Sequence, residues 1–309
     1  MNQTQPLMTK ATVTRGSGHG STLLKKSIPY LMIAPLLLLI GIFIFRPVVF
    51  SVYLSLQDWQ LGSGKRVYIG FDNYLKLAGS QEFWNALLNS LLYTLVVGGL
   101  SIALGLGLAV ILRHVVYLRE AWQAVFFLPV AATLSGMAVV WRFIFNPSVG
   151  ALNGLIVALG LPAQDWLSSD LWARVIVAWV GIWASAGYAM VLFSAGLTTI
   201  PRDLHEAASI DGATPAQQFR FVTWPLLAPT TLFVLVIITL RAMESFDTVR
   251  ILTDGGPLRA TQTLSHLLYQ EGFSFFNAGY ASSIALVYFV LLAGIAWLQV
   301  RRDREVHYE

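Results

Sequence analysis

Five polar side chains interrupt two of the most apolar parts of the sequence, and their types suit the binding of a small polar molecule. Ser185 and Tyr188 are three residues apart, so a helix would place them on one face. Arg241, Glu244 and Ser245 cluster at the end of the following apolar stretch. A guanidinium group can form paired hydrogen bonds to phosphate, sulfonate or carboxylate, so Arg241 predicts contact with an anionic group.

Other roles for the same side chains stay open. Tyr188 could pack against neighbours with its hydroxyl satisfied. Arg241 could extend to the membrane surface or pair with Glu244 or Asp247. If these apolar stretches cross a membrane, ionisable residues within them generally face a bundle interior or a water-filled cavity, and this directs attention to the two stretches as a candidate binding site.

No group of residues predicts catalysis. His205 precedes Glu206, but no second histidine follows at the spacing of a zinc-binding H-E-x-x-H helix. A serine nucleophile elbow is missing as well. Gly62–Lys65 reads GSGK but lacks the remaining residues of a phosphate-binding P-loop, so the chain is not expected to hydrolyse ATP. The absence of cysteine excludes disulfides and thiolate metal sites.

The composition is that of an integral membrane protein. Hydrophobic residues make up 56% of the 309 residues and charged residues 12%, against about 25% charged in an average soluble domain. A spanning helix needs about 20 apolar residues. Six such runs predict an all-α protein with six transmembrane helices, at residues 28–56, 86–112, 121–145, 171–197, 226–243 and 280–300.

The basic residues give the orientation of these helices. They concentrate in the N-terminal tail, in the connection between the second and third runs, and at the C-terminus. By the positive-inside rule both termini are expected in the cytoplasm. The charge bias of the polar stretch 198–225 is weak, and counting the six spans places it in the cytoplasm as well. We expect a disordered tail at 1–27 and a cytoplasmic tail at 301–309. The basic residues form no patch interleaved with aromatic residues, so no nucleic acid partner is predicted.

The polar stretch has the pattern of two short helices joined by a glycine turn. Residues 202–210 offer an apolar face, and Gly212 is the usual residue just beyond a helix end. Thr214, Pro215 and Gln217 form the sequence pattern of a capping box that opens a second helix. Pro225 then opens the next apolar run.

Small residues recur every fourth position in the second run, at Gly99, Ala103 and Gly107. Such a row lets two helix backbones approach closely in a membrane. We expect this row to pack inside the bundle, with contact to another subunit as the alternative.

The polar stretch resembles the EAA loop of the membrane subunits of bacterial ABC importers that work with a solute-binding protein. Glu206, Ala207 and Ala208 are followed by Gly212 after three residues and by Val222 after a further nine. The usual leucine before the final proline is Trp224 here. The segments IGFDNYLKL at 69–77, NPSVGALNGL at 146–155 and SFDTVRILTDGGP at 245–257 resemble the carbohydrate branch, which includes maltose and glycerol-3-phosphate importers.

The resemblance implies the type I importer permease architecture, with the EAA segment as a cytoplasmic coupling helix. It implies that Glu206, Ala207, Ala208, Asp211 and Gly212 contact an ATPase, and that Glu206 pairs with a basic group there. It also implies a second homologous permease subunit, two ATPase subunits that bind ATP and Mg, an external solute-binding protein, and a place in the bacterial inner membrane.

The resemblance further implies that solute contacts come from the fourth and fifth spans, with a tyrosine at the place of Tyr188. Arg241 stands where relatives have aromatic or amide groups, and this favours an anionic sugar derivative. Three alternatives remain: an ordinary amphipathic surface loop at 198–225, a secondary transporter driven by an ion gradient, and a membrane enzyme. No span midpoint carries the acid expected of the second, and no catalytic residues support the third.

Overall fold

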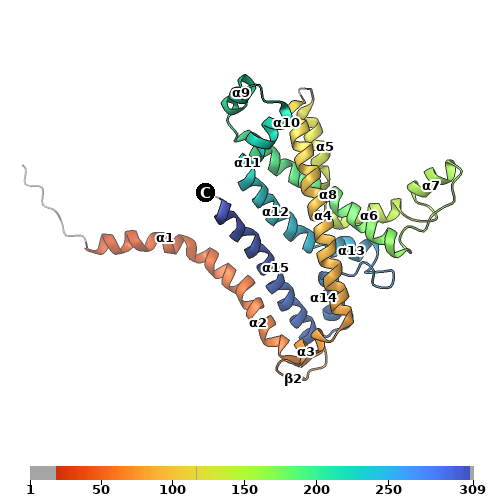
Figure 1. The fold of residues 1–309 in the computed structure, drawn as a ribbon. Helices are drawn as coiled ribbons and strands as arrows, with labels where there is room; N and C mark the ends of the chain where they lie inside the picture. Colours follow the sequence, from red (N-terminus) through yellow and green to blue (C-terminus); the bar gives the residue numbers. More distant parts are fainter. Residues whose placement is uncertain (1–18, 116, 307–309) are drawn as a thin grey trace, which may run out of the picture. The chain divides into compact units, whose positions relative to one another are not determined.

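The computed structural model describes residues 19–115 and 117–306, and most of them are helical (Figure 1). Contacts divide the chain into residues 1–50 and residues 51–309. The first unit consists of α1 (His19–Ile40), a π-helical turn (Gly41–Phe45) and the start of α2 (Arg46–Ser55). Helix α1 begins at His19, so the expected disordered tail to residue 27 is helical from residue 19 onward, and residues 1–18 lie outside the described part.

A short hairpin and helix open the second unit. Strand β1 (Gln57–Trp59) pairs antiparallel with β2 (Arg66–Tyr68). Helix α3 (Asp72–Ala78) follows the hairpin. The GSGK sequence forms the turn between the strands, with Gly62 and Gly64 at positive φ.

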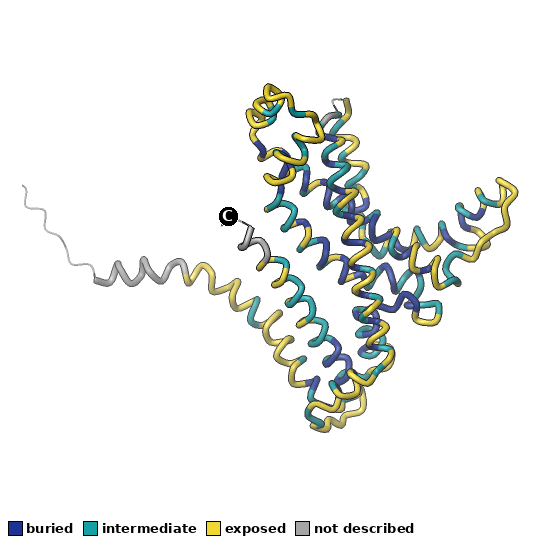
Figure 2. Tube along the Cα trace, viewed as in Figure 1, coloured by how far each residue is buried: buried dark blue, intermediate teal, exposed yellow. Residues whose placement is uncertain are grey.

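Helices α4 (Gln81–His114) and α8 (Asp170–Thr198) form the most extensive helix–helix contact of this unit. Of the apolar stretch of α8, 61% is buried, against 33% for α4, so α8 is the central helix. Buried residues concentrate where these helices meet α12 and α13 (Figure 2).

Gly105 sets the approach of α4 to α8. A Cβ atom at this position would lie 2.5 Å from the Ala189 Cβ and 2.8 Å from the Met190 backbone nitrogen. Ser101 and Ala109, one turn away on either side, are fully buried. The close approach of the two helix backbones at this level therefore depends on the missing side chain of Gly105.

The row that the sequence singled out lies on a different face of α4. Gly99 and Ala103 are exposed. Apart from the adjoining backbone of α4 itself, no atom of the described residues lies within 4 Å of a Cβ built at Gly99 or Gly107. The expected packing of this row inside the bundle is therefore wrong, because the buried small residues are offset from it along the helix.

The third predicted span is two short helices rather than one straight helix. Helix α5 (Arg119–Ala131) and α6 (Leu134–Ile144) meet at 96°. Pro129 lacks the N–H that would continue the ladder, and Ala132 and Thr133 are extended. Hydropathy gives the length of this run but not its bend. Helix α7 (Ala151–Ala158) follows.

The fifth span is also bent. The coupling segment, residues 198–225, contains α9 (Arg202–Ile210), α10 (Pro215–Gln218) and a π-helical turn (Phe219–Thr223), and it runs into α11 (Trp224–Leu226). Helix α12 (Ala228–Met243) then departs at 69°, and α13 (Phe246–Leu252) extends it. Pro225 lies within the helical run, so the bend falls at Leu227 instead.

The last elements are α14 (Leu264–Tyr269), a π-helical turn (Gln270–Ser274) and α15 (Ala278–Val306). Helix α15 continues past the predicted end of the last span at residue 300. The described residues contain four uninterrupted helices that are long and apolar enough to cross a membrane, or six spans if each bent pair counts as one. The all-α membrane fold with up to six spans is confirmed.

Candidate functional site

The turn in the coupling segment is built by its own backbone. Helix α9 ends at Ile210, and Gly212 adopts φ +77°. The Ala213 N–H donates to the Ala208 carbonyl at 2.9 Å, and the Gly212 N–H donates to the Ser209 carbonyl at 3.1 Å. These two bonds form a Schellman motif, which a glycine just beyond the helix end permits.

The second helix is capped as its sequence predicts. The Thr214 Oγ1 accepts a hydrogen bond from the Gln217 N–H, and the Thr214 N–H donates to the Gln217 Oε1 at 2.8 Å. The Gln218 side chain donates to the Ser209 Oγ at 2.9 Å and to the Ala213 carbonyl at 3.2 Å. The Gln218 side chain thereby links α10 to the end of α9, and the two helices form one structured unit.

Helix α9 turns apolar side chains outward. Leu204 is 44% exposed and Ile210 is 86% exposed. Glu206, Ala207 and Asp211 are exposed as well, while Ala208 is half-buried and Gly212 forms the turn. The five residues expected to contact an ATPase therefore lie together on α9 and the turn that follows it.

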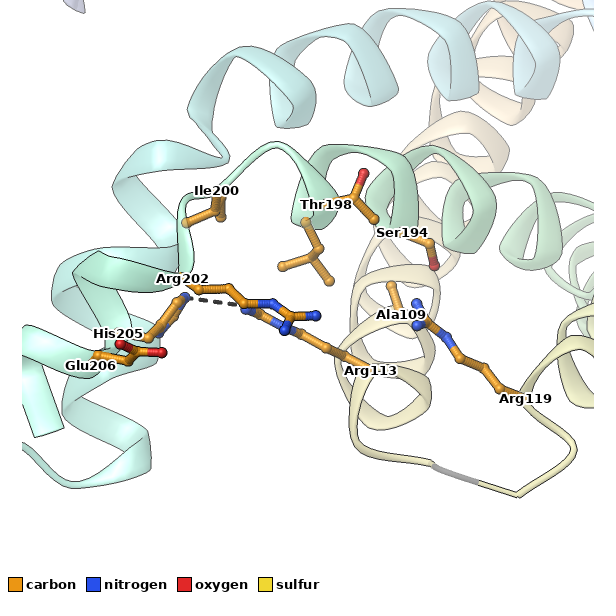
Figure 3. Close-up of a pocket in the computed structure, with 10 residues that line it drawn as sticks. Ala109, Arg113, Arg119, Ser194, Thr198, Ile200, Arg202, His205 and Glu206 are labelled. Atoms are coloured by element: carbon orange, nitrogen blue, oxygen red, sulfur yellow. Dashed lines mark hydrogen bonds between the residues drawn. The ribbon is translucent and has the colours of Figure 1, made fainter.

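A cavity of about 470 Å³ lies beside α9, where the end of α4, the start of α5 and the end of α8 meet (Figure 3). Arg113, Arg119 and Arg202 line it together with His205 and Glu206. The Arg113 Nη1 lies 3.4 Å from the His205 Nε2. Arg113 and Arg119 belong to the basic residues between the second and third apolar runs, which indicate only the orientation of the helices in the membrane. No local sequence pattern links them to α9.

A second cavity of about 230 Å³ lies between α4, α8 and α12–α13. Ser185, Arg241, Glu244 and Ser245, four of the five residues predicted to line a solute path, contribute to its wall. The fifth, Tyr188, contacts Arg241, whose Cζ lies 4.8 Å from the centre of the tyrosine ring. The five polar residues predicted on two separate helices thus lie at or beside one cavity.

Arg241 has no carboxylate partner in this arrangement. The ion pairs among the described residues involve other basic groups. Neither Glu244 nor Asp247 comes within 4.0 Å of the Arg241 guanidinium, although both line the same cavity. Arg241 instead makes the cation–π contact with Tyr188, and its pairing with either of these acids is not seen among the described residues.

Tyr93 and Thr248 also line this cavity and were not predicted. The Tyr93 hydroxyl donates to the Val177 carbonyl at 3.5 Å. A tyrosine in the middle of an apolar run is itself a signal, since its hydroxyl needs a partner.

Comparison with known proteins identifies the family. Residues 101–308 match the model of the binding-protein-dependent transport system inner membrane component. The probable ABC transporter permease protein YurN of Bacillus subtilis is 36% identical, covering 89% of this chain and 96% of its own. The trehalose/maltose transport system permease protein MalF of Thermococcus litoralis is 33% identical, with 89% and 94% covered. The sulfoquinovosyl glycerol transport system permease protein SmoG of Agrobacterium fabrum is 33% identical, with 84% and 85% covered.

The fold is also found in a solved structure. A chain of a bacterial alginate ABC transporter, crystallised with an alginate pentasaccharide-bound periplasmic protein, superposes with a TM-score of 0.81 at 24% identity, covering 94% of this chain and 98% of that one. The resemblance seen in the loop motifs is confirmed by these matches. The chain belongs to the binding-protein-dependent transport system inner membrane components, as a membrane-spanning permease subunit of the ABC importer class.

Proposed function

We propose that this chain forms part of the translocation pathway of an ATP-driven importer for a sugar or a sugar derivative, including anionic derivatives. The observation that carries the proposal is the α9–α10 helix pair, a capped and structured element that exposes two large apolar side chains, Leu204 and Ile210, among charged ones. The family and the named substrates of the relatives support the solute class. Nothing in the described residues favours an ion-gradient-driven secondary transporter, the alternative open at the sequence level.

In this proposal α9 is the coupling helix. Leu204 and Ile210 expose apolar surface that a cleft of an ATPase would cover. Glu206 lies between them on the same helix, exposed and without an ion pair among the described residues. It would pair with a basic group of the ATPase, so that closure of the ATPase dimer moves α9 and, through α11 and α12, the membrane helices.

Replacement of Glu206 tests the docking. We expect Glu206→Ala and Glu206→Lys to leave the thermal unfolding of the purified permease unchanged, since the side chain is exposed. Both should reduce ATPase co-purification and solute uptake, with lysine the more severe because it would repel a basic partner. Glu120→Ala removes an exposed carboxylate from α5 and serves as the charge-matched control. Normal co-purification and uptake in both Glu206 variants would contradict the docking proposal.

The second cavity is proposed as the solute path of this subunit. Hydroxyl and carboxylate groups of Ser185, Ser245 and Glu244 can exchange hydrogen bonds with sugar hydroxyls, and Tyr188 supplies an aromatic surface. Arg241, which has no carboxylate partner, adds a donor fork for a phosphate, sulfonate or carboxylate group. This combination fits a polyol or sugar that carries an anionic group.

Uptake by Arg241→Ala and Arg241→Gln variants in the assembled complex tests this assignment. If the solute is anionic, we expect the apparent affinity to fall roughly tenfold or more, because each variant removes a charge-assisted contact. A neutral sugar should be little affected. Arg142→Gln removes an exposed arginine from α6 outside the cavity and is the control. Unchanged apparent affinity for the cognate solute would overturn the role of Arg241.

The other components of the proposed importer are separate protein chains. We infer that two ATPase subunits bind ATP and Mg, since the sequence contains no P-loop and this chain is proposed to be non-catalytic without a cofactor of its own. A second, homologous permease subunit and an external solute-binding protein complete the complex in the inner membrane. The family description, which names a binding-protein-dependent system, supports the last of these. Both termini are proposed to lie in the cytoplasm.

A further inference from the structure

The cavity beside α9 carries more positive charge than its walls neutralise. Its ionisable lining consists of three arginines, one histidine and one glutamate. Three arginines against Glu206 leave an excess of two positive charges with the histidine neutral. Among the described residues no carboxylate lies within 4.0 Å of Arg113, Arg119 or Arg202. Like charges that line one cavity repel each other, and a bound anion would reduce this repulsion.

The guanidinium groups come from three different elements. Arg113 lies at the end of α4, Arg119 opens α5, and Arg202 opens α9. Figure 3 shows the Arg119 side chain extending from the start of α5, the Arg113 side chain extending from α4 toward His205, and the Arg202 side chain extending from the start of α9 toward α4. Donors that converge from separate elements form a site rather than a stripe on one helix.

Two buried polar atoms at this cavity lack partners. The Nε of Arg119 and the Oγ of Ser194 are shielded from solvent and have no hydrogen-bond partner in the described structure. A buried polar atom without a partner is destabilising, and native proteins rarely leave one unexplained. Both residues line this cavity. A bound acceptor group is one source of the missing partners, with a small shift of these side chains to open the two atoms to it.

We propose that this cavity binds a phosphate group, carried either by an anionic phospholipid or by a free phosphate compound. Guanidinium forks match tetrahedral oxyanions, and Ser194 adds a hydroxyl donor. The neighbouring helix α5 exposes Trp122 and Val125, at 50% and 61%, so the cavity adjoins surface that suits lipid. Basic pockets between transmembrane helices on the cytoplasmic side bind phospholipid head groups in the same way.

The site would join the start of α9 to the ends of α4 and α8. A bound phosphate contacts Arg202 on α9 and Arg113 on α4 at once. It would therefore hold the coupling helix against the membrane core independently of any ATPase. The proposal concerns this chain alone, so its test does not depend on the proposed coupling role of Glu206.

Binding is measured on the purified full chain in a neutral detergent. Inorganic phosphate is titrated by calorimetry, with chloride at equal ionic strength as the blank. Phosphatidylglycerol is offered in nanodiscs against phosphatidylcholine, and retained lipid is counted by native mass spectrometry. We expect saturable binding of at least one of the two probes. Competition between them would show that they share the site, and preference for phosphatidylglycerol identifies lipid as the source.

Variants assign the binding to the cavity. Arg119→Gln and Arg202→Gln should each weaken binding roughly tenfold, the scale of one lost charged contact. Arg220→Gln removes an exposed arginine of the coupling segment that does not line the cavity, and it should bind like the wild type. Ser194→Ala, which keeps every charge, should weaken binding less than either arginine variant.

The outcomes separate clearly. Absence of both phosphate and phosphatidylglycerol binding by the wild type overturns the proposal and leaves the arginines to a partner's carboxylates. Equal weakening by Arg220→Gln and Arg119→Gln overturns it as well, because binding would then follow net charge alone. If Arg119→Gln fails to fold, Arg202→Gln on the exposed start of α9 gives the same comparison.

Discussion

Gly105 allows the close approach of α4 and α8, the most extensive helix–helix contact of the second unit. A methyl group there would enter the space of Ala189 and the Met190 backbone, whereas a methyl at Gly107 meets open space in the described structure. We expect Gly105→Ala to lower the free energy of unfolding by about 1–3 kcal/mol through overpacking. Gly107→Ala should be neutral or stabilising by up to about 1 kcal/mol, since alanine favours helix.

Thermal unfolding of both variants in one detergent measures this contrast. Because the two substitutions are expected to change stability in opposite directions, the comparison separates overpacking at Gly105 from the general effect of replacing a glycine in α4. Equal shifts in melting temperature for the two variants would show that the α4–α8 contact does not depend on Gly105.

Asp254 holds a connection between α13 and α14 through two partners. Arg250 donates a hydrogen bond to its carboxylate, and the His266 Nε2 lies 3.0 Å from its Oδ1. The hydrogen bond from Arg250 lowers the pKa of Asp254 below its ordinary value, with a further contribution from His266. The folded state therefore favours the charged carboxylate.

The sign of the pH dependence follows from this shift. The stabilising contribution is complete above the unfolded pKa of about 3.9 and is lost as the pH falls through the lower folded value. We expect Asp254→Asn to lower the melting temperature at pH 7, and the difference from the wild type to disappear as the pH falls below about 4. A difference that stays constant from pH 7 to pH 3 would mean that the carboxylate charge is not the source.

The amount that the sequence predicts differs between side chains. Four predicted residues line one cavity: Ser185 on α8, and Arg241, Glu244 and Ser245 at the end of α12. The sequence predicts this because helical spacing sets the face on which each side chain lies, and the two helices are neighbouring spans. The contact of Arg113 with His205 joins positions 92 residues apart. Local pattern carries no information about such a contact, since it depends on how α4 packs beside the end of α8.

The capping box makes α10 a defined element rather than a loose connection. Thr214→Ala removes the side-chain oxygen that accepts from the Gln217 N–H, and we expect a loss of about 1 kcal/mol, the usual cost of a lost N-cap. Thr133 stands at the N-cap of α6 without a side-chain cap hydrogen bond, so Thr133→Ala is the matched control.

Amide hydrogen exchange over residues 215–219 localises the effect. Faster exchange there in Thr214→Ala, but not in Thr133→Ala, is the expected result. Unchanged exchange would mean that α10 is held by its neighbours and not by its cap.

The helix pair of the coupling segment was predictable because its signals are local: a glycine beyond one helix end and a capping box at the next. The bends in the third and fifth spans were not. Pro129 and Pro225 mark where a hydrogen bond is missing, but Pro225 lies within a helical run and the chain bends at Leu227. Leu227 is fully buried in the core formed with Phe193 and Ile200, so tertiary packing decides where the direction changes.

The whole chain lacks cysteine, which makes its proposed membrane topology directly testable. Ser63 lies in the hairpin turn and Ala216 lies in α10, and both are exposed. We expect Ser63→Cys to react with a membrane-impermeant maleimide in intact spheroplasts, and Ala216→Cys to react only in inverted vesicles. The unmodified chain provides a background without labelling. Labelling of both positions from the same side would contradict an outer hairpin with a cytoplasmic coupling segment.

The two glycine sets of α4 differ in what evolution can do with them. At Gly105 every other amino acid collides with backbone as well as side chain, so substitution there requires a compensating change in α8. Gly99 and Gly107 face open space in this chain, so larger residues fit at both positions unless a neighbouring subunit lies against them. The variability of Gly99 and Gly107 among relatives, compared with that of Gly105, would therefore reveal whether this side of α4 meets lipid or another protein.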